Sequence, residues 1–205
     1  RMCARWLPRR LFGAVDTVGR SAVGRCRRAA QSLRYLSRTM MYALVGDWEA
    51  FGRTRHVWRV RGHSMVGLPG LFATYDVTRD LTHRQVQGDL VECGVARGGS
   101  AGLMRLAAGH DSCVRDLWLF DTFEGLPAPG PRDAPDVCWT VSGDRRQPCL
   151  HEGYCYGSYE EVRAFLCGSL HVPPPRIHMV KGLFADTLPV HRELVGDIAI
   201  LRIDA

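Results

Sequence analysis

Short apolar runs alternate with longer amphipathic stretches along the chain after residue 65. Over residues 66–82, Leu68, Leu71 and Tyr75 recur at helical spacing, which predicts a helix with one apolar face. The elements predicted beyond it are, in order, a strand over 88–94, a helix over 99–108, a strand over 116–121, a helix over 158–167, a strand over 176–181, a short helix over 184–188 ended by Pro189, and a strand over 197–203. Strands that alternate with helices in this way indicate an α/β domain with a parallel sheet and right-handed crossovers.

An acid and a glycine-rich turn follow the first predicted strand. Glu92 ends the strand, Gly94, Gly98 and Gly99 form the turn, and Ser100 opens the next helix. Glycine lets the backbone approach a ligand closely, and Ser100 can cap the helix, whose first N–H groups favour a carboxylate. The spacing departs from the dinucleotide pattern G-x-G-x-x-G, because three residues separate Gly94 from Gly98. It fits a nucleoside ligand with a carboxylate tail and no pyrophosphate, which describes S-adenosylmethionine.

A second acid ends the second predicted strand. The apolar run Leu117–Phe120 leads directly into Asp121. In α/β nucleotide-binding units, an acid at this place accepts hydrogen bonds from the ribose diol. We therefore expect Asp121 to contact the ribose hydroxyls of the same ligand.

Four further sequence blocks occur in an order typical of one enzyme family. They are Asp121–Pro127, Gly157–Arg163, Lys181–Pro189 and Ile198–Asp204. From about residue 60 to residue 205 the chain resembles the macrocin O-methyltransferase family, also called TylF, whose members methylate hydroxyls, characteristically of sugars on natural products. The resemblance implies a Rossmann-like class I methyltransferase fold, S-adenosylmethionine as cofactor and a small-molecule hydroxyl as acceptor. A generic nucleotide-binding α/β domain is the alternative.

The resemblance also implies a set of cofactor contacts. Glu92 is expected beside the methionine part of the cofactor, and Gly182 and Phe184 beside the adenine. Ala96 stands where the family commonly has Trp, and His63 replaces an aromatic residue, so the role of His63 stays open. The expected cofactor-binding residues are Ser64, Met65, Glu92, Gly94, Ala96, Arg97, Gly98, Gly99, Ser100, Asp121, Thr122, Gly182 and Phe184.

One acid, Asp204, is expected to bind a metal. In the family it belongs to an Asp-x-Asp sequence that helps to hold a divalent ion, usually Mg²⁺, which prefers carboxylate oxygens and lowers the pKa of the acceptor hydroxyl. The sequence ends one residue later, at Ala205. We therefore expect only the first four strands or so of the sheet, a general base beyond Ala205, and little or no methyl transfer by this chain alone. The alternative function is a catalytically inactive cofactor-binding or interaction protein, and a homo-oligomer is left open.

Positive charge is concentrated at the N-terminus. The net charge is +6, and residues 1–38 hold ten Arg against one acid, Asp16. Lys181 is the only Lys, a bias typical of GC-rich coding, so the Arg content is poor evidence for nucleic acid. Three interpretations stay open for this arm: an organelle transit peptide, a contact with anionic lipid or nucleic acid, and a solvated extension.

These observations set the expected domains and compartment. We expect a basic Arg-rich extension over residues 1–45 and a cofactor-binding methyltransferase domain over residues 46–205, with a polar and aromatic connection at 47–62. No apolar run approaches the ~20 residues of a membrane span. A nucleic-acid partner is not expected, because no nucleic-acid-binding module is recognised. The expected location is the cytoplasm, or an organelle if the arm is a transit peptide.

Two further segments carry expectations. The cysteines Cys138, Cys149 and Cys155 lie near His151 but lack the C-x-x-C pairs of a structural zinc site. Reduced thiols are expected in preference to zinc or disulfides. Residues 124–156 show no periodicity and hold several Pro and Gly, and a segment of that length in a compact domain is usually functional or mobile. We expect it to form a lid over the cofactor.

Overall fold

The computed structural model describes residues 26, 29–109, 115–128, 130 and 152–204. The chain divides into two compact units, residues 1–54 and 55–205. In the first unit residues 29–44 are helical, and the Tyr35 hydroxyl donates to the Thr54 carbonyl over 3.0 Å. The transit-peptide and basic-arm interpretations fall mostly on residues 1–25, which lie outside the described residues. None of the described helices is long and apolar enough to cross a bilayer.

The second unit is built on a four-stranded parallel sheet, which confirms the predicted α/β class. Its strands are β1 (Asp89–Cys93), β2 (Leu117–Asp121), β3 (Ile177–Lys181) and β4 (Ile198–Ile203), in the order β3-β2-β1-β4. The chain moves outward from β1 to β3 and then returns to place β4 on the other side of β1. In such sheets ligands bind outside the carboxyl ends of the strands, at the point where the order reverses. Here that point is between β1 and β4.

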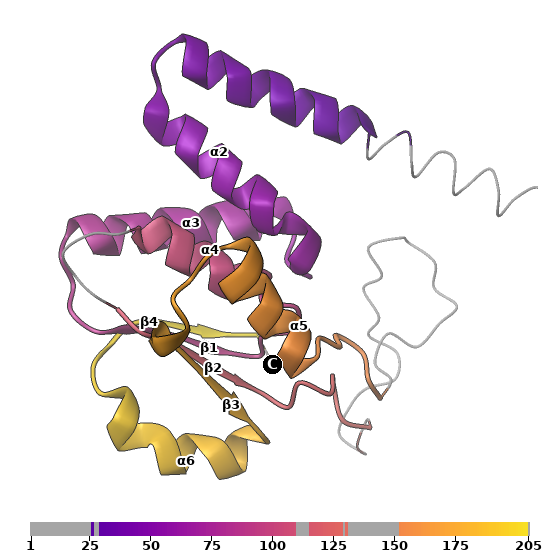
Figure 1. The fold of residues 1–205 in the computed structure, drawn as a ribbon, viewed down its shortest axis with the longest axis vertical. Helices are drawn as coiled ribbons and strands as arrows, with labels where there is room; N and C mark the ends of the chain where they lie inside the picture. The colour runs from indigo at the N-terminus through magenta and orange to yellow at the C-terminus, as the bar shows by residue number, and fades with distance from the viewer. Residues whose placement is uncertain (1–25, 27–28, 110–114, 129, 131–151, 205) are drawn as a thin grey trace, which may run out of the picture. The chain divides into compact units, whose positions relative to one another are not determined.

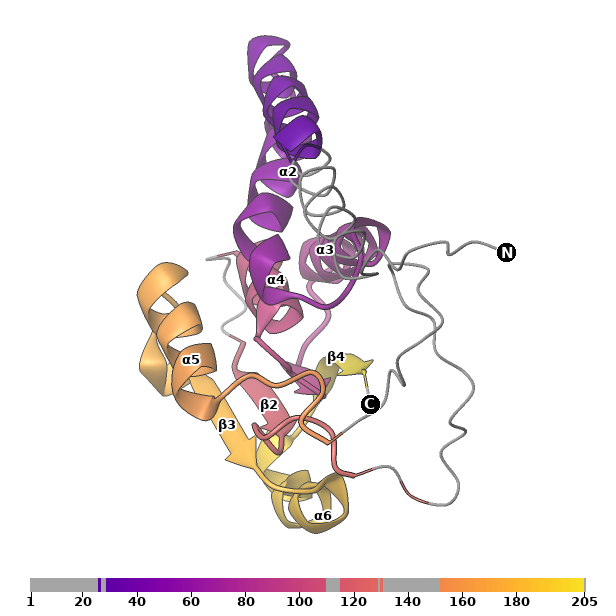
Figure 2. The same cartoon turned by 90° about the vertical axis from the view of Figure 1, so that its right-hand side faces the viewer.

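Helices cover both faces of the sheet (Figures 1 and 2). On one face α4 (Gly99–Ala108) packs against α3 (Leu68–His83) and against α5 (Tyr159–Arg163), which continues as a π-helical turn over Ala164–Ser169. Ser158 and Glu161 begin α5 with a reciprocal capping box. On the opposite face lies α6 (Phe184–Val195), the crossover between β3 and β4.

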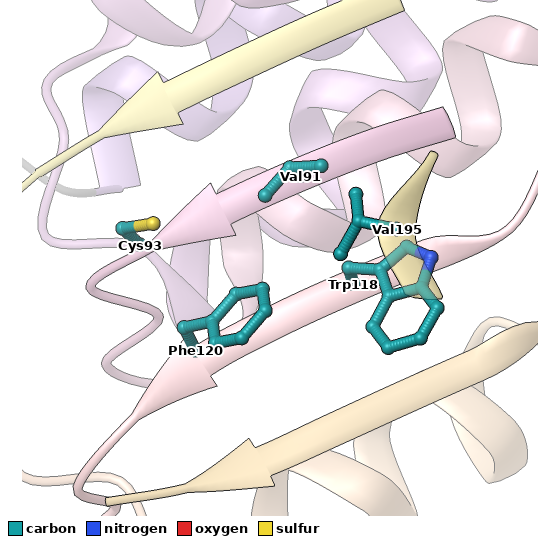
Figure 3. Packing of buried hydrophobic residues seen from close by; sticks show 5 residues of the cluster. All are labelled: Val91, Cys93, Trp118, Phe120 and Val195. Atoms are coloured by element: carbon teal, nitrogen blue, oxygen red, sulfur yellow. The ribbon is translucent and has the colours of Figure 1, made fainter. Parts of the chain in front are cut away.

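The side chains of β1 and β2 alternate between these two faces. Val91 and Cys93 of β1 pack with Trp118 and Phe120 of β2 and with Val195 of α6 (Figure 3). By the two-residue period of a strand, Leu90 and Glu92, like Leu117 and Leu119, point to the α4 side. Because both faces of these central strands are covered, their sequences are almost continuously apolar. Apart from Asp89 and Asp121 at the strand ends, Glu92 is the exception, and it is buried with 1% of its surface exposed.

Two helices differ from the prediction. The expected connection at 47–62 is instead helix α2 (Trp48–Val60), followed by a 3₁₀ turn over Arg61–His63. Its many Arg and aromatic residues and an internal glycine hid the helical spacing of the buried Val57 and Val60.

The other difference is in α6, which we expected to end at Pro189. It continues through Pro189 to Val195 and ends at Gly196, where φ is +64°. Proline removes one backbone hydrogen bond from a helix interior. The packing of Val195 on the core and of the His191 ring against Trp118 and Phe120 opposes that cost.

Candidate cofactor site

A cavity of about 490 Å³ opens at the carboxyl ends of the strands, where the sheet order reverses. It is lined by every residue expected to bind cofactor or metal except Arg97 and Gly98. The Arg97 side chain is exposed, and its Nε donates to the Tyr156 carbonyl over 3.5 Å. Added to Gly98, a Cβ atom would lie 3.1 Å from Cγ1 of Val162, so this glycine lets α5 pack close to α4.

The glycine-rich turn has the backbone shape that its composition predicted. Gly94, Ala96 and Gly98 all have positive φ, at +87°, +47° and +79°. Gly98 is the N-cap of α4 and no side chain caps the helix, so the prediction that Ser100 caps it is wrong. Ser100 lies one residue inside the helix, because the helix already begins at Gly99.

Gly99 allows a second close approach. A Cβ atom there would lie 2.6 Å from the carbonyl carbon and oxygen of His63. The absence of that atom lets the segment His63–Met65 run past the start of α4 and form one wall of the cavity. The Oγ atoms of Ser64 and Ser100 are 3.5 Å apart across this contact.

Asp121 fastens the glycine-rich turn to the end of β2. Its Oδ2 accepts from the backbone N–H groups of Val95 (2.6 Å) and Ala96 (3.1 Å), and its Oδ1 accepts from that of Phe123 (2.8 Å). The sequence did not indicate the contacts with Val95 and Ala96, because they join residues about 25 positions apart. Asp121 therefore shapes the turn as well as lining the cavity, and its contact with ribose stays a prediction.

Glu92 lies in the floor of the cavity with a single side-chain partner of opposite charge. Nε of Arg202 donates to its Oε1 over 2.9 Å, whereas Oε2 is buried and has no hydrogen-bond partner among the described residues. Burial raises the pKa of Glu92 to about 8 and the Asp204 charge adds to the rise, whereas the Arg202 guanidinium and, more weakly, the backbone N–H of Ala101 oppose it. An unpartnered buried oxygen of this kind is costly to a fold unless a ligand supplies the donor.

Asp204 does not form a metal site with the described residues. Nη2 of Arg202 donates to its Oδ2 over 2.6 Å, and its side chain is half-exposed. Within the described part of the chain, no three His, Cys, Asp or Glu side chains are grouped so that they could hold a metal ion. One carboxylate that is already paired with arginine falls short of the oxygen ligands that Mg²⁺ requires.

His63 is the aromatic wall that the sequence left without a role. Its ring stacks on Phe165, with centroids 3.7 Å apart and planes 13° apart. Partial burial, and secondarily the nearby Arg97, lower the pKa of His63, so the neutral ring is favoured. A neutral stacked ring offers a flat apolar surface to the cavity.

The two ends of the segment predicted as a lid, residues 124–156, pair with each other and form a further wall of the cavity. The sequence did not indicate this pairing. The N–H of Leu126 donates to the Tyr154 carbonyl (2.8 Å), and the N–H of Gly153 donates to the Leu126 carbonyl (2.9 Å). These contacts bring Gly125–Pro127 and Tyr154–Cys155 together at the cavity. Residues 131–151 of the predicted lid lie outside the described residues. Cys138, Cys149 and His151, the residues considered for a zinc site, lie within that segment.

Comparison with known proteins assigns the family. The family model for macrocin-O-methyltransferase (TylF) matches residues 25–205. The chain belongs to the TylF family. The match begins well before residue 60, where the resemblance was expected to start.

Characterised relatives of this TylF-family chain are O-methyltransferases. Demethyldecarbamoylnovobiocin O-methyltransferase of Streptomyces niveus is 33% identical over 150 residues, which are 72% of this chain and 53% of that protein. The 8-demethyl-8-(2,3-dimethoxy-alpha-L-rhamnosyl)-tetracenomycin-C 4′-O-methyltransferase of Streptomyces olivaceus is 34% identical over the same shares. The solved structure of the O-methyltransferase NovP is similar with a TM-score of 0.52 and 32% identity, over 69% of this chain and 55% of that one. The chain thus spans about half the length of the relatives that it matches.

Proposed function

We propose that the cavity binds S-adenosylmethionine and that the whole protein transfers its methyl group to a hydroxyl of a sugar or similar small molecule. One observation carries the proposal: the acid, the glycine-rich turn and the start of α4 meet in a cavity at the point of strand reversal. The family membership and the O-methyltransferase relatives support the same proposal.

Each wall of the cavity offers a different kind of contact. The first N–H groups of α4, after Gly98 and Gly99, suit the carboxylate of the methionine part. The unpartnered oxygen of Glu92 suits its ammonium group. Asp121 and Thr122 offer oxygens to the ribose, and the outer wall offers Gly182 and Phe184 to the adenine.

When bound, S-adenosylmethionine supplies the methyl group on a sulfonium. The contribution of the residues described here is positioning, which by itself can account for a large part of such a transfer. The acceptor hydroxyl must lose a proton, and no described residue is assigned as its base. A Mg²⁺ ion at Asp204 would require oxygen ligands beyond the described residues and the release of Asp204 from Arg202, so we derive no step through a metal.

Titration calorimetry of this chain with S-adenosylmethionine, without and with Mg²⁺, tests the proposal. We expect saturable one-to-one binding, with an affinity that does not depend on Mg²⁺, and little or no methyl transfer to sugar hydroxyls by this chain alone. A matched control is Gly168→Ala, because a Cβ atom at Gly168 would meet nothing within 4 Å. Failure of the chain and of this control to bind the cofactor would overturn the proposal.

A further inference from the structure

Arg202 joins two carboxylates that lie at the same cavity. Glu92 of β1 and Arg202 of β4 are register partners in the parallel ladder, so their side chains lie on the same face of the sheet. The Arg202 guanidinium places Nε 2.9 Å from Oε1 of Glu92 and Nη2 2.6 Å from Oδ2 of Asp204. Both carboxylates line the cavity.

We propose that Arg202 is a positioning residue, which aims the free oxygen of Glu92 at the amino-acid part of the bound cofactor. The proposal rests on the proposed function, since it concerns the same cavity. Arg202 occupies Oε1 of Glu92 and leaves Oε2 as the oxygen without a partner. A long acidic side chain has several rotamers, and a second charged contact from a neighbouring strand selects one of them.

Asp204 completes the arrangement by holding the other end of the guanidinium. Its own N–H donates to the Cys93 carbonyl over 2.8 Å, which ties the end of β4 to the end of β1. Arg202 is therefore fixed at both ends, with about a fifth of its side chain exposed. When both carboxylates are ionised, they and the guanidinium together carry one negative charge, which is complementary to an ammonium group of a ligand. Burial favours the protonated form of Glu92 in the empty cavity, and an ammonium group beside Oε2 favours the ionised form.

An ion pair elsewhere in the sheet shows what a purely structural role looks like. Asp116 receives Arg176 on one oxygen (2.8 Å) and His178 on the other (2.7 Å). Neither oxygen of Asp116 lacks a partner, and none of these residues lines the cavity. At Glu92 the arginine occupies one oxygen only, and no other side chain among the described residues donates to the second one.

Binding of two ligands to one set of variants tests this role. S-adenosylmethionine carries the amino-acid part on a sulfonium, whereas 5′-methylthioadenosine keeps the nucleoside and the S-methyl group as a neutral thioether and lacks the amino-acid part. In Arg202→Ala we expect ~10- to 100-fold weaker binding of S-adenosylmethionine, the range for a lost charged contact. Binding of 5′-methylthioadenosine should change less than ~3-fold, because the adenine and ribose walls are untouched. Arg202→Lys, which keeps the charge but loses the planar fork that spans the two carboxylates, should fall between wild type and Arg202→Ala for S-adenosylmethionine.

Glu92→Gln supplies the background that separates positioning from a structural effect. If Arg202 acts through Glu92, then Arg202→Ala adds less than ~3-fold to the loss already caused by Glu92→Gln. Equal weakening of both ligands by Arg202→Ala, or an undiminished loss in the Glu92→Gln background, would overturn the proposal and leave the proposed function standing. If the wild-type chain binds neither ligand, the proposed function fails and this inference falls with it. Arg176→Ala is the matched control, and it should bind both ligands like wild type.

Discussion

Asp116 and Glu92 lie at opposite ends of the same sheet and meet opposite surroundings. Asp116 precedes β2 at the amino ends of the strands, where Arg176 and His178 each take one of its oxygens. Burial alone would raise the pKa of Asp116, but these two hydrogen bonds outweigh it and the pKa lies below its usual value. Glu92 is at the carboxyl end, where one arginine contact does not offset complete burial and the pKa rises to about 8.

The neighbours of the two acids extend the contrast. Close to Asp116, Asp89 accepts from the Asp116 N–H (2.9 Å) and from the Trp118 indole N–H (3.0 Å), and the Trp118 ring stacks on His178. At the carboxyl end, the space beside Glu92 is not filled by such side chains and forms part of the cavity. Buried polar groups in folded proteins are nearly always satisfied, and the exceptions tend to mark functional positions. The hydrogen bonds around Asp116 thus stabilise the fold at the amino end of the sheet. At the carboxyl end, the unsatisfied oxygen of Glu92 lowers stability and can bind a ligand.

The largest effect on stability and on cofactor affinity is expected for a substitution of Asp121, at the carboxyl end of the sheet. Asp121→Ala leaves three backbone N–H groups without their acceptor, at about 1 kcal/mol or more each, so we expect a loss of about 3 kcal/mol in the free energy of unfolding. The glycine-rich turn should loosen with it, and S-adenosylmethionine should bind ~100-fold more weakly. Urea unfolding and calorimetry measure the two losses.

Asp116→Ala is the control for Asp121→Ala. It should lower the free energy of unfolding and leave the cofactor affinity within ~3-fold of wild type, because the sites are well separated. A loss of affinity in Asp116→Ala as large as that in Asp121→Ala would erase the proposed difference between the two ends of the sheet.

The second prediction is a pH dependence of stability. Glu92 has a raised pKa in the folded chain, so the folded state holds its proton more tightly than the unfolded state, whose value is near 4.5. Its contribution to stability is therefore lost as pH rises from about 4.5 through about 8, and between pH 6.5 and 8 the loss is on the order of 2 kcal/mol. The stability of Glu92→Gln should not show this fall.

Asp116 should behave in the opposite way. Because its pKa is lowered on folding, its stabilising contribution is present above the ordinary value of 3.8 and is lost as pH falls through the lowered pKa. Chemical unfolding of wild type, Glu92→Gln and Asp116→Asn across pH measures both effects. Parallel stability curves for wild type and Glu92→Gln above pH 6.5 would contradict the burial argument for Glu92.

The central strands and the site acids could be predicted from the sequence, and their contacts could not. The predicted strands 88–94 and 116–121 agree with β1 and β2 to within one residue at each end, because strands covered on both faces are nearly continuous apolar runs. The pairing of Glu92 with Arg202 depends on β4 lying beside β1, which is decided by the return of the chain through α6. Local periodicity carries no information about that return.

The cavity walls show the same limit. The contact between Leu126 and Tyr154 joins residues separated by a long segment without periodicity, so no pattern indicated that both ends would face the cofactor. Gly157 was noticed only as the first residue of a family block. It is the residue against which the turn at Ala96 rests, and that role depends on tertiary packing alone.

The third prediction uses this missed glycine. A Cβ atom at Gly157 would fall on the Ala96 carbonyl group, 2.7 Å from its carbon and 3.1 Å from Cα of Arg97. These are backbone atoms, so the glycine-rich turn itself must move. Overpacking of this kind costs about 1–3 kcal/mol, and Gly157→Ala should bind S-adenosylmethionine ~10-fold more weakly. Gly168→Ala, which adds the same atom in open space, should bind like wild type; equal affinities in the two variants would show that the turn tolerates displacement.

The smallest effect is expected for Arg176→Ala, at the amino end. Arg176 is 2.8 Å from Oδ1 of Asp116, but close to half of its side chain is exposed, so solvent screening limits the pair to about 0.5 kcal/mol. Asp116 keeps its bond to His178, and the stack of His178 on Trp118 remains, so the strand ends should stay in place.

Thermal unfolding of Arg176→Ala at low and at high salt should show a small loss of stability relative to wild type that salt removes, because an exposed ion pair is screened. Calorimetry on the same protein should give the wild-type cofactor affinity. If Arg176→Ala instead weakened cofactor binding as strongly as Arg202→Ala, the amino end of the sheet would have to transmit its state to the cavity, and the separation of a stabilising end from a binding end would not hold.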